Sequence, residues 1–199
     1  CMKKLVFIFF IFLVLNNNKL LAYSSEPKSF ISELVTEAIN VLSDKSLSDE
    51  KKTNVITLIA KENVDIKALG YYTLGSVRKS LDQSILEQYN NLFEKYFLKS
   101  LTSRLSEYSD QTFEVTGSEQ KSANYTIVFS SVSGETKSPE IKVNWRVYTK
   151  NPSKPLIRDL IVEGLSLAKT QKEEFASILN SNNNDVAKLL DRLKEFINN

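Results

Sequence analysis

Three carboxylates stand out as side chains whose type suits acid–base chemistry, namely Asp65, Asp159 and Glu163. A pair of carboxylates acts as acid and base in glycosidases, but no two of these three stand in an obviously polar segment. The chain has no histidine, and its single cysteine is Cys1. These absences exclude serine–histidine and cysteine–histidine catalysis and ordinary zinc sites. We therefore predict no catalytic residue, no metal site and no cofactor.

Some of the charged residues also have structural or binding roles open to them. Asp159 lies within an apolar run, where a carboxylate needs a partner, so we expect a salt bridge or a backbone hydrogen bond, with Arg78 or Arg146 as candidate cations. Arg78 itself suits a phosphate at the mouth of a binding site, although a surface ion pair is the more ordinary role. We expect Glu163 and Gly164 to turn a strand into the following helix.

Gly70 and Gly75 stand close together in a run that otherwise reads as helix, although the chain has only 5 glycines. Glycine inside a helix costs about 1 kcal/mol relative to alanine. Either the two glycines break the helix beside a cavity and leave space there, or one ends the helix and the other lies in a tight loop.

The elements that must position these residues follow from the spacing of apolar side chains. Helical spacing predicts helices over 27–41, from the SLSDEKK segment to 59, and over 63–75, 81–108, 166–179 and 185–197. Ser80 and Gln83 form a capping box at the start of the longest helix. From Thr112 the pattern alternates with a period of two, which predicts strands over 112–119, 124–135, 139–150 and 156–164.

The gaps between the predicted strands have hairpin length, which favours an antiparallel sheet. We predict an α+β fold in the order helices, strands, helices, with a four- to five-stranded antiparallel sheet covered on one face by helices. No repeat or linker divides the chain, so residues 25–199 are expected to form a single domain.

Residues 1–24 have the order of a cleaved signal peptide: Lys3 and Lys4, an apolar run from Leu5 to Leu15, and small residues before Ser25. That apolar run is too short to cross a bilayer as a helix, so we expect export with cleavage. The leader holds three lysines and no acid, so the 26 basic and 24 acidic side chains of the whole chain leave a net charge of −1 after its removal. That balance does not suggest a nucleic-acid partner.

Two segments carry a resemblance to a known family. The first is VDIKALGYYTLGSVRKSLDQSILEQYNNLFEKYFLKSL, with Asp65, Leu74–Gly75, Arg78, Tyr89, Phe93, Tyr96 and Phe97. The second is IRDLIVEGLSLAKTQKEEFASIL, with Asp159, Val162–Glu163–Gly164, Ser166, Lys172 and Phe175. In order and spacing they resemble the toluene-tolerance/MlaC family of periplasmic phospholipid carriers. The chain departs from that pattern at Val77 and Pro155, where the family has tryptophan, and at Lys172, where it has arginine.

The resemblance implies a soluble periplasmic carrier that moves glycerophospholipid between an outer-membrane lipoprotein complex and an inner-membrane ABC transporter. It also implies acyl chains in a slot between helices and a curved sheet, with the head group outside. Two acyl chains have about 30 methylenes, and exposing these to water costs on the order of 20–25 kcal/mol. The protein must therefore provide an apolar tunnel.

We expect that tunnel to be lined by apolar residues of the long helix, the segment before it and one face of the sheet, with Arg78 at the mouth. The lining residues predicted on this basis are Leu74, Gly75, Val77, Leu81, Phe93, Phe97, Leu101, Val115, Ile127, Phe129, Ile141, Val143 and Trp145. The sequence does not separate cavity lining from ordinary core.

Three other functions stay open: the same fold carrying a hopanoid or another apolar ligand, an envelope scaffold with a dry core, and a carboxylate enzyme. Mass spectrometry of an organic extract from the natively purified protein distinguishes them. Phospholipid near one per chain supports the carrier, whereas an empty extract together with a solid core supports the scaffold.

The oligomeric state gives a first prediction. Nothing in the sequence reads as an additional exposed apolar helix face, so we expect the mature protein to be a monomer when free. Light scattering checks this, and a stable dimer would contradict it.

A second prediction concerns Gly75. If small residues at this position keep the cavity open, Gly75→Leu should reduce lipid occupancy without unfolding the protein. Lipid content is measured by mass spectrometry and folding by circular dichroism. Normal occupancy in the folded variant would count against a cavity that depends on Gly75.

Overall fold

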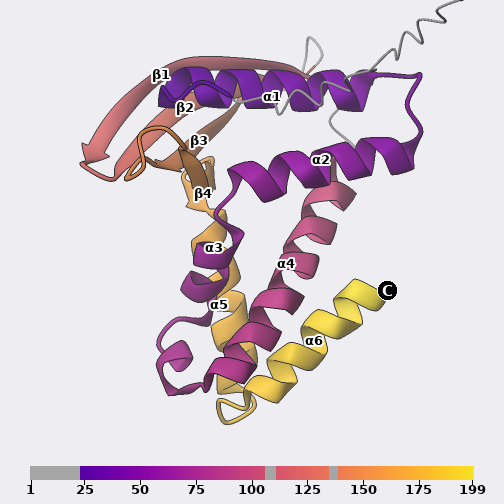
Figure 1. The fold of residues 1–199 in the computed structure, drawn as a ribbon, viewed down its shortest axis with the longest axis vertical. Helices are drawn as coiled ribbons and strands as arrows, with labels where there is room; N and C mark the ends of the chain where they lie inside the picture. The colour runs from indigo at the N-terminus through magenta and orange to yellow at the C-terminus, as the bar shows by residue number, and fades with distance from the viewer. Residues whose placement is uncertain (1–22, 106–110, 135–138) are drawn as a thin grey trace, which may run out of the picture.

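A computed structural model describes residues 23–105, 111–134 and 139–199. Almost all of the predicted signal peptide, residues 1–24, and the predicted end of the long helix at 108 lie outside these ranges. The chain forms a block of helices, then a block of strands, then a second block of helices (Figure 1). In chain order they are α1 (Pro27–Ser43), α2 (Asp49–Asn63), α3 (Ile66–Leu74), the 3₁₀ turn η1 (Val77–Ser80), α4 (Gln83–Leu105), β1 (Thr112–Ser122), β2 (Tyr125–Ser133), β3 (Ile141–Tyr148), β4 (Leu156–Val162), β5 (Leu165–Ser166), α5 (Leu167–Asn180) and α6 (Val186–Asn198).

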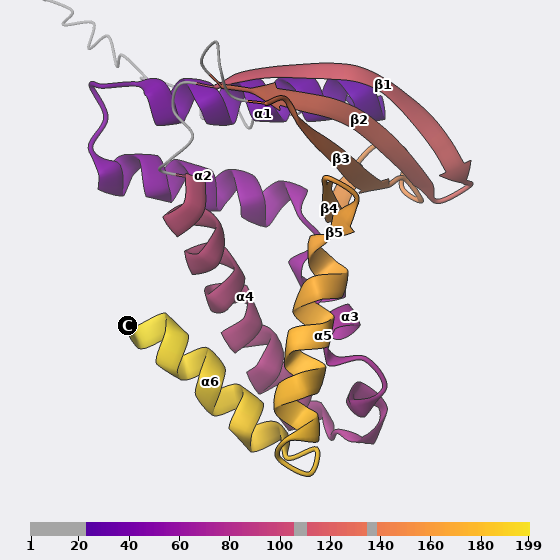
Figure 2. The same ribbon diagram turned by 180° about the vertical axis from the view of Figure 1, so that it is seen from behind.

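The five strands form one antiparallel sheet in the order β1-β2-β3-β4-β5, as a meander in which each strand pairs with the next. The sheet is strongly curved, and α1 lies along one of its faces (Figures 1 and 2). The predicted α+β class, strand directions and helix–strand–helix order are therefore confirmed. The two-residue strand β5 was not predicted, because it is too short to show alternation.

Alternation along the strands gives the sheet two different faces. On the face under α1, the side chains of Val128, Val147 and Ile157 pack with Phe30 and Ile31 of α1, and all five are almost completely buried. This cluster fixes α1 against the sheet.

The opposite face carries a different set of side chains. Phe129 of β2 pairs with Asn144 of β3, which pairs with Ile161 of β4. Ile127 pairs with Arg146 in the next row. Because these residues are not covered by α1, this face is free to form the wall of a cleft.

The helices α3 to α6 form a second core below the sheet (Figure 2). Gly70 of α3 is buried there, and a Cβ atom at this position would lie 3.0 Å from the Phe93 ring of α4. Thr73 donates a hydrogen bond to the Gly70 carbonyl at 2.8 Å and shares another with the buried Tyr89 hydroxyl at 2.7 Å. Gly70 therefore allows α3 and α4 to approach closely, while Gly75 ends α3 as its C-cap with φ of +60°.

The predicted capping box at Ser80 and Gln83 is wrong. The Ser80 hydroxyl donates to the Val77 carbonyl inside η1. Asp82 is the residue that caps α4, because its carboxylate accepts a hydrogen bond from the Ile85 amide at 2.9 Å. The short 3₁₀ turn after Gly75 occupies the residues that would otherwise start the helix.

Two carboxylates join the helices to β4. Asp65 caps α3 through the Ala68 amide and also binds the Arg158 guanidinium of β4 at 2.7 Å and 2.8 Å. Next to it, the Asp65 amide donates to the Ile157 carbonyl at 2.9 Å. The start of α3 is thereby attached directly to the sheet.

Asp159 makes the second connection. Its side chain is buried and accepts hydrogen bonds from the Ala168 amide at 3.0 Å and the Ser166 hydroxyl at 2.6 Å, with the Arg146 guanidinium 3.6 Å away. The expected partners, a backbone amide and a cation, are both present, and the cation is Arg146. Glu163 and Gly164, with φ of 48° and 82°, turn β4 back into β5 and α5 as predicted.

The burial of Asp159 gives a stability prediction. Asp159→Ala leaves the Ala168 amide and the Ser166 hydroxyl without their buried acceptor, so it should lower the free energy of unfolding by about 3 kcal/mol. The matched control is Asp185→Ala, because Asp185 caps α6 from an exposed position; that change should cost about 1 kcal/mol. Urea denaturation measures both values, and equal losses would contradict a special role for the buried carboxylate.

Candidate functional site

A cavity of about 450 Å³ lies between the α1 side of the sheet and the helices α1 to α5. Its walls are mainly apolar. They include Leu34, Val35, Ala38, Ile39 and Leu42 of α1, Ile56 and Ile59 of α2, Phe93, Phe97 and Leu101 of α4, and Phe113, Val132, Val143, Trp145 and Leu160 of the sheet.

The long helix contributes one apolar wall because of its residue spacing. Phe93, Phe97 and Leu101 follow one another at intervals of four residues, which places them on one face of a helix. On the sheet, Val143 and Trp145 are two residues apart and so share a face. Both predicted patterns therefore meet across the same cavity.

Trp145 forms a wall without leaving a polar atom unpaired. Its indole nitrogen donates to the Ser130 hydroxyl at 2.9 Å, and that hydroxyl donates to the Val143 carbonyl at 2.6 Å. The ring also meets Phe113 edge to face, with 6.2 Å between centroids. These contacts fix the indole plane and leave its apolar surface toward the cavity.

The size of the cavity suits hydrocarbon. An apolar cavity of about 150 Å³ accepts one benzene molecule, so about 450 Å³ has room for about eighteen carbon atoms. That is one fatty chain of ordinary length, and so less than the roughly 30 methylenes of the two acyl chains for which a tunnel was expected. Among the polar residues on the wall, Thr73 and Asp159 have hydrogen-bond partners in the protein. Oε1 of Gln111, which also lines the cavity, is buried and has no partner among the described residues.

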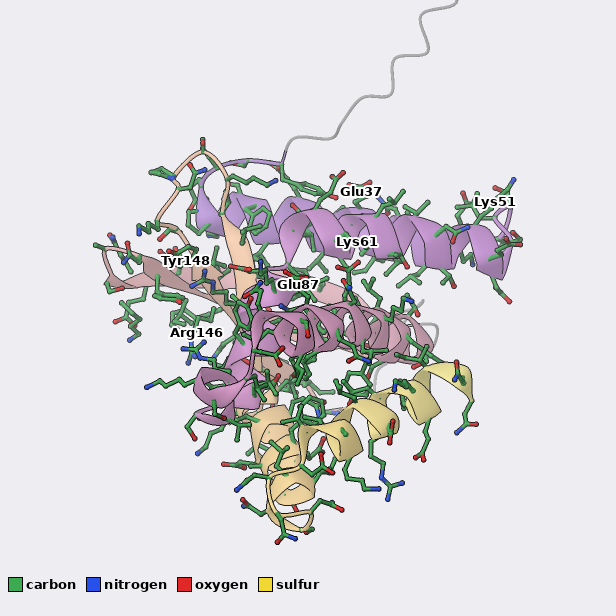
Figure 3. The ribbon with its side chains drawn as sticks, turned by 60° about the horizontal axis from the view of Figure 1, so that its bottom comes forward. Glu37, Lys51, Lys61, Glu87, Arg146 and Tyr148 are labelled. Atoms are coloured by element: carbon green, nitrogen blue, oxygen red, sulfur yellow. The ribbon has the colours of Figure 1, made fainter. Side chains whose placement is uncertain are left out.

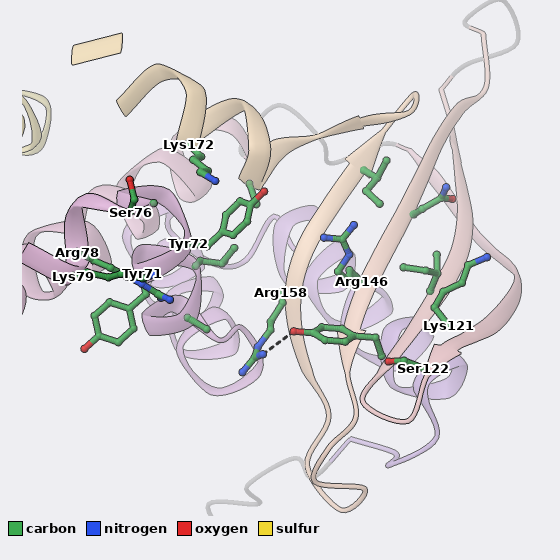
Figure 4. Close-up of a pocket in the computed structure, with 18 of the residues that line it drawn as sticks. Tyr71, Tyr72, Ser76, Arg78, Lys79, Lys121, Ser122, Arg146, Arg158 and Lys172 are labelled. Carbon is green, nitrogen blue, oxygen red and sulfur yellow. Dashed lines mark hydrogen bonds between the residues drawn. The ribbon is translucent and has the colours of Figure 1, made fainter. Parts of the chain in front are cut away.

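A second, larger space lies against the opposite face of the sheet. This cleft of about 1130 Å³ is bounded by α3, η1 and α5 on one side and by the strands on the other (Figure 4). Its lining includes Ile127, Phe129 and Ile161 and a group of basic residues, Arg78, Lys79, Lys121, Arg146, Arg158 and Lys172.

Arg158 is the most strongly held of these basic side chains. Its guanidinium binds Asp65 and donates to the Tyr125 hydroxyl at 2.8 Å. The guanidinium carbon also lies 3.4 Å from the centre of the Tyr148 ring. Burial works against its charge, but the hydrogen bonds to Tyr125 and Asp65 outweigh burial and raise the pKa of Arg158. Arg158 therefore stays charged and mainly supports the cleft wall.

Gly75 has a clear role beside the cleft. A Cβ atom there would lie 3.3 Å from Cε of Lys172, so the missing side chain gives Lys172 its path toward the cleft. The Lys172 ammonium lies 5.1 Å from the centre of the Tyr72 ring. Figure 4 shows both side chains on the helical side of the space.

The predicted lining residues divide into three groups. Phe93, Phe97, Leu101, Val143 and Trp145 line the apolar cavity. Gly75, Arg78, Ile127 and Phe129 line the basic cleft instead. Leu74, Val77, Leu81, Val115 and Ile141 line neither space. That any of these residues contacts a ligand stays a prediction.

Strand register explains why the predicted sheet residues separate. Ile127 and Phe129 pair with Arg146 and Asn144, so they share the face opposite to Trp145. The sequence shows which residues of one strand share a face, but it does not show which residues of the next strand lie on that same face of the sheet. Leu74 is core, packed among the helices.

Sequence reasoning missed the cavity wall formed by α1 and α2. Ala38, Ile39 and Leu42 belong to the apolar stripe of the first helix, which was visible as a stripe but not assigned to a cavity. It also missed Lys79, Lys121 and Lys172 in the cleft. Isolated lysines carry no spacing pattern, so only the fold brings them together.

The three carboxylates that suggested acid–base chemistry all serve the fold. Asp65 and Asp159 bind Arg158 and the start of α5, as described above, and Glu163 accepts a hydrogen bond from the Lys142 amide of β3. Within residues 23–105, 111–134 and 139–199, no group of three or more acidic, histidine or cysteine side chains is arranged to hold a metal ion. None of the helices in those ranges is long and apolar enough to cross a membrane.

Comparison with known proteins places this fold. Residues 32–195 match the family model described as MlaC protein. A solved structure, the phospholipid-binding protein from Ralstonia solanacearum in complex with a phospholipid, superimposes with a TM-score of 0.69. It shares 17% sequence identity, and the alignment covers 84% of this chain and 94% of that protein. No curated protein matches the chain. Because the family match spans most of its length, the chain belongs to the MlaC family.

Proposed function

We propose that this protein is a phospholipid carrier of the periplasm, which holds acyl-chain hydrocarbon in the cavity between α4 and the α1 side of the sheet. The observation that carries the proposal is the cavity itself, because it is apolar and has the volume of a fatty chain. Membership of the MlaC family and the similar fold of a protein that binds phospholipid support it.

The energy of chain burial agrees with a carrier role. About eighteen carbons at about 0.8 kcal/mol each give on the order of 14 kcal/mol of hydrophobic transfer energy, before the entropic cost of holding the lipid. A lipid held this way does not escape readily into water. We infer that it is exchanged only with a membrane or with a partner, namely an outer-membrane lipoprotein complex and an inner-membrane ABC transporter.

The direct test is the lipid content of the protein. The protein is purified from cells without detergent, extracted with organic solvent, and the extract is identified by mass spectrometry. Phospholipid at about one per chain is the expected result, by the stoichiometry of a single cavity. A hopanoid or another apolar ligand would correct the class of cargo, and an empty extract would contradict the proposal.

A cavity-filling variant makes a sharper prediction than Gly75→Leu, because Gly75 lines the cleft and its positive φ strains any other residue. Ala38→Phe places a ring from α1 into the cavity and should lower the lipid content severalfold. The matched control is Asn40→Phe, which adds the same ring to an exposed position of α1. Thermal unfolding shows that both variants are folded, and equal lipid content in the two would contradict the location of the chain.

A further inference from the structure

The basic cleft on the other face of the sheet is not explained by chain burial. Among the described residues that line it, six have cationic side chains, from η1, α5, β1, β3 and β4, and none is acidic. The chain as a whole is nearly neutral, with 26 basic and 24 acidic residues. A concave surface of one sign concentrates ions of the opposite sign. The cleft is therefore suited to an anion.

Three of the six cations already have an acidic neighbour. Arg158 binds Asp65 at 2.7 Å, Arg146 lies 3.6 Å from Asp159, and Lys121 pairs with Glu119. These three line the sheet side of the cleft, where Lys121 lies on β1 and Arg146 on β3 (Figure 4).

The other three cations lie on the helical side. Arg78 stands 6.0 Å from the centre of the Tyr71 ring, and Lys172 stands 5.1 Å from that of Tyr72. Within the described part of the chain, neither these two nor Lys79 forms an ion pair. Their charge is available to a ligand.

The cleft and the apolar cavity are neighbours. Leu69 of α3 and Ala168 of α5 line both spaces. A phospholipid has the same arrangement, because its phosphate is attached through glycerol to the acyl chains. A binding site for one such molecule therefore needs a charged surface for the phosphate next to an apolar cavity for the acyl chains.

We propose that the cleft binds the phosphate-bearing head group of the carried lipid and so selects lipids with a net negative charge over zwitterionic ones. This inference rests on the proposed function, since it assumes that a lipid chain occupies the cavity. Arg78, Lys79 and Lys172 supply the selection. A zwitterionic head group adds its own cation to a site that already holds several, whereas an anionic head group does not.

The test is a competition for loading. Lipid-free protein is incubated with vesicles of phosphatidylglycerol and phosphatidylethanolamine in equal amounts with identical chains, separated from them, and its lipid is analysed by mass spectrometry. We expect the native protein to prefer phosphatidylglycerol by about tenfold, as three partly exposed charge contacts would give together. The preference should weaken at high salt.

The variant Arg78→Gln, Lys79→Gln, Lys172→Gln removes the three unpaired charges. It should lose the preference while the total lipid per chain stays close to the native value. The control Lys51→Gln, Lys95→Gln, Lys188→Gln changes the net charge equally at exposed positions outside the cleft, and it should keep the preference. Lys51 lies at the end of α2 that is farther from Arg146 of the cleft (Figure 3).

Each outcome decides between distinct possibilities. An unchanged preference in the cleft variant, or no preference in the native protein, would overturn head-group selection and leave chain binding intact. A native protein that takes up no lipid would overturn the proposed function and this inference with it. Free inorganic phosphate that binds the lipid-loaded protein as tightly as the lipid-free protein would show a separate phosphate site and would also overturn the proposal.

Discussion

The arrangement depends on the attachment of two helices to one strand through buried or partly buried carboxylates. Asp65 holds the start of α3 against Arg158, and Asp159 holds the start of α5 through the Ala168 amide. A cavity lined by apolar side chains tends to collapse, because its walls would gain contacts by closing. With α3 and α5 fixed to β4, the packing of α4 against them sets its distance from the sheet. The hollow between α4 and the sheet follows from this attachment.

The curved sheet then presents its two faces to chemically different spaces, which share Leu69 and Ala168 as wall residues. Its α1 side faces a cavity of fatty-chain size, and its other side faces a cleft with six cations. Alternation along each strand produces this difference, since Trp145 and Arg146 are adjacent in sequence and belong to different spaces. A single meander can in this way serve both the hydrocarbon and the charged part of an amphipathic molecule.

The sequence predicted the elements well because helical and strand periodicities are local properties. The alternation of Val143 and Trp145 and the stripe of Phe93 and Phe97 are local patterns of this kind, and these residues lie on the wall of the apolar cavity, while their contact with a lipid stays a prediction. The phase of β2 could not be predicted, because pairing register is set across strands, and so Ile127 appeared on the wrong side. The basic cleft depends on residues distant in sequence and has no local pattern at all.

The position of the acyl chain can be measured directly, because Trp145 is the only tryptophan in the chain and lies on the cavity wall. Phospholipid with bromine atoms on an acyl chain quenches indole fluorescence on contact. Protein loaded with brominated lipid should therefore be strongly quenched relative to protein loaded with the same lipid without bromine. Unchanged fluorescence, with mass spectrometry showing the brominated lipid bound, would place the chain outside this cavity and contradict the account.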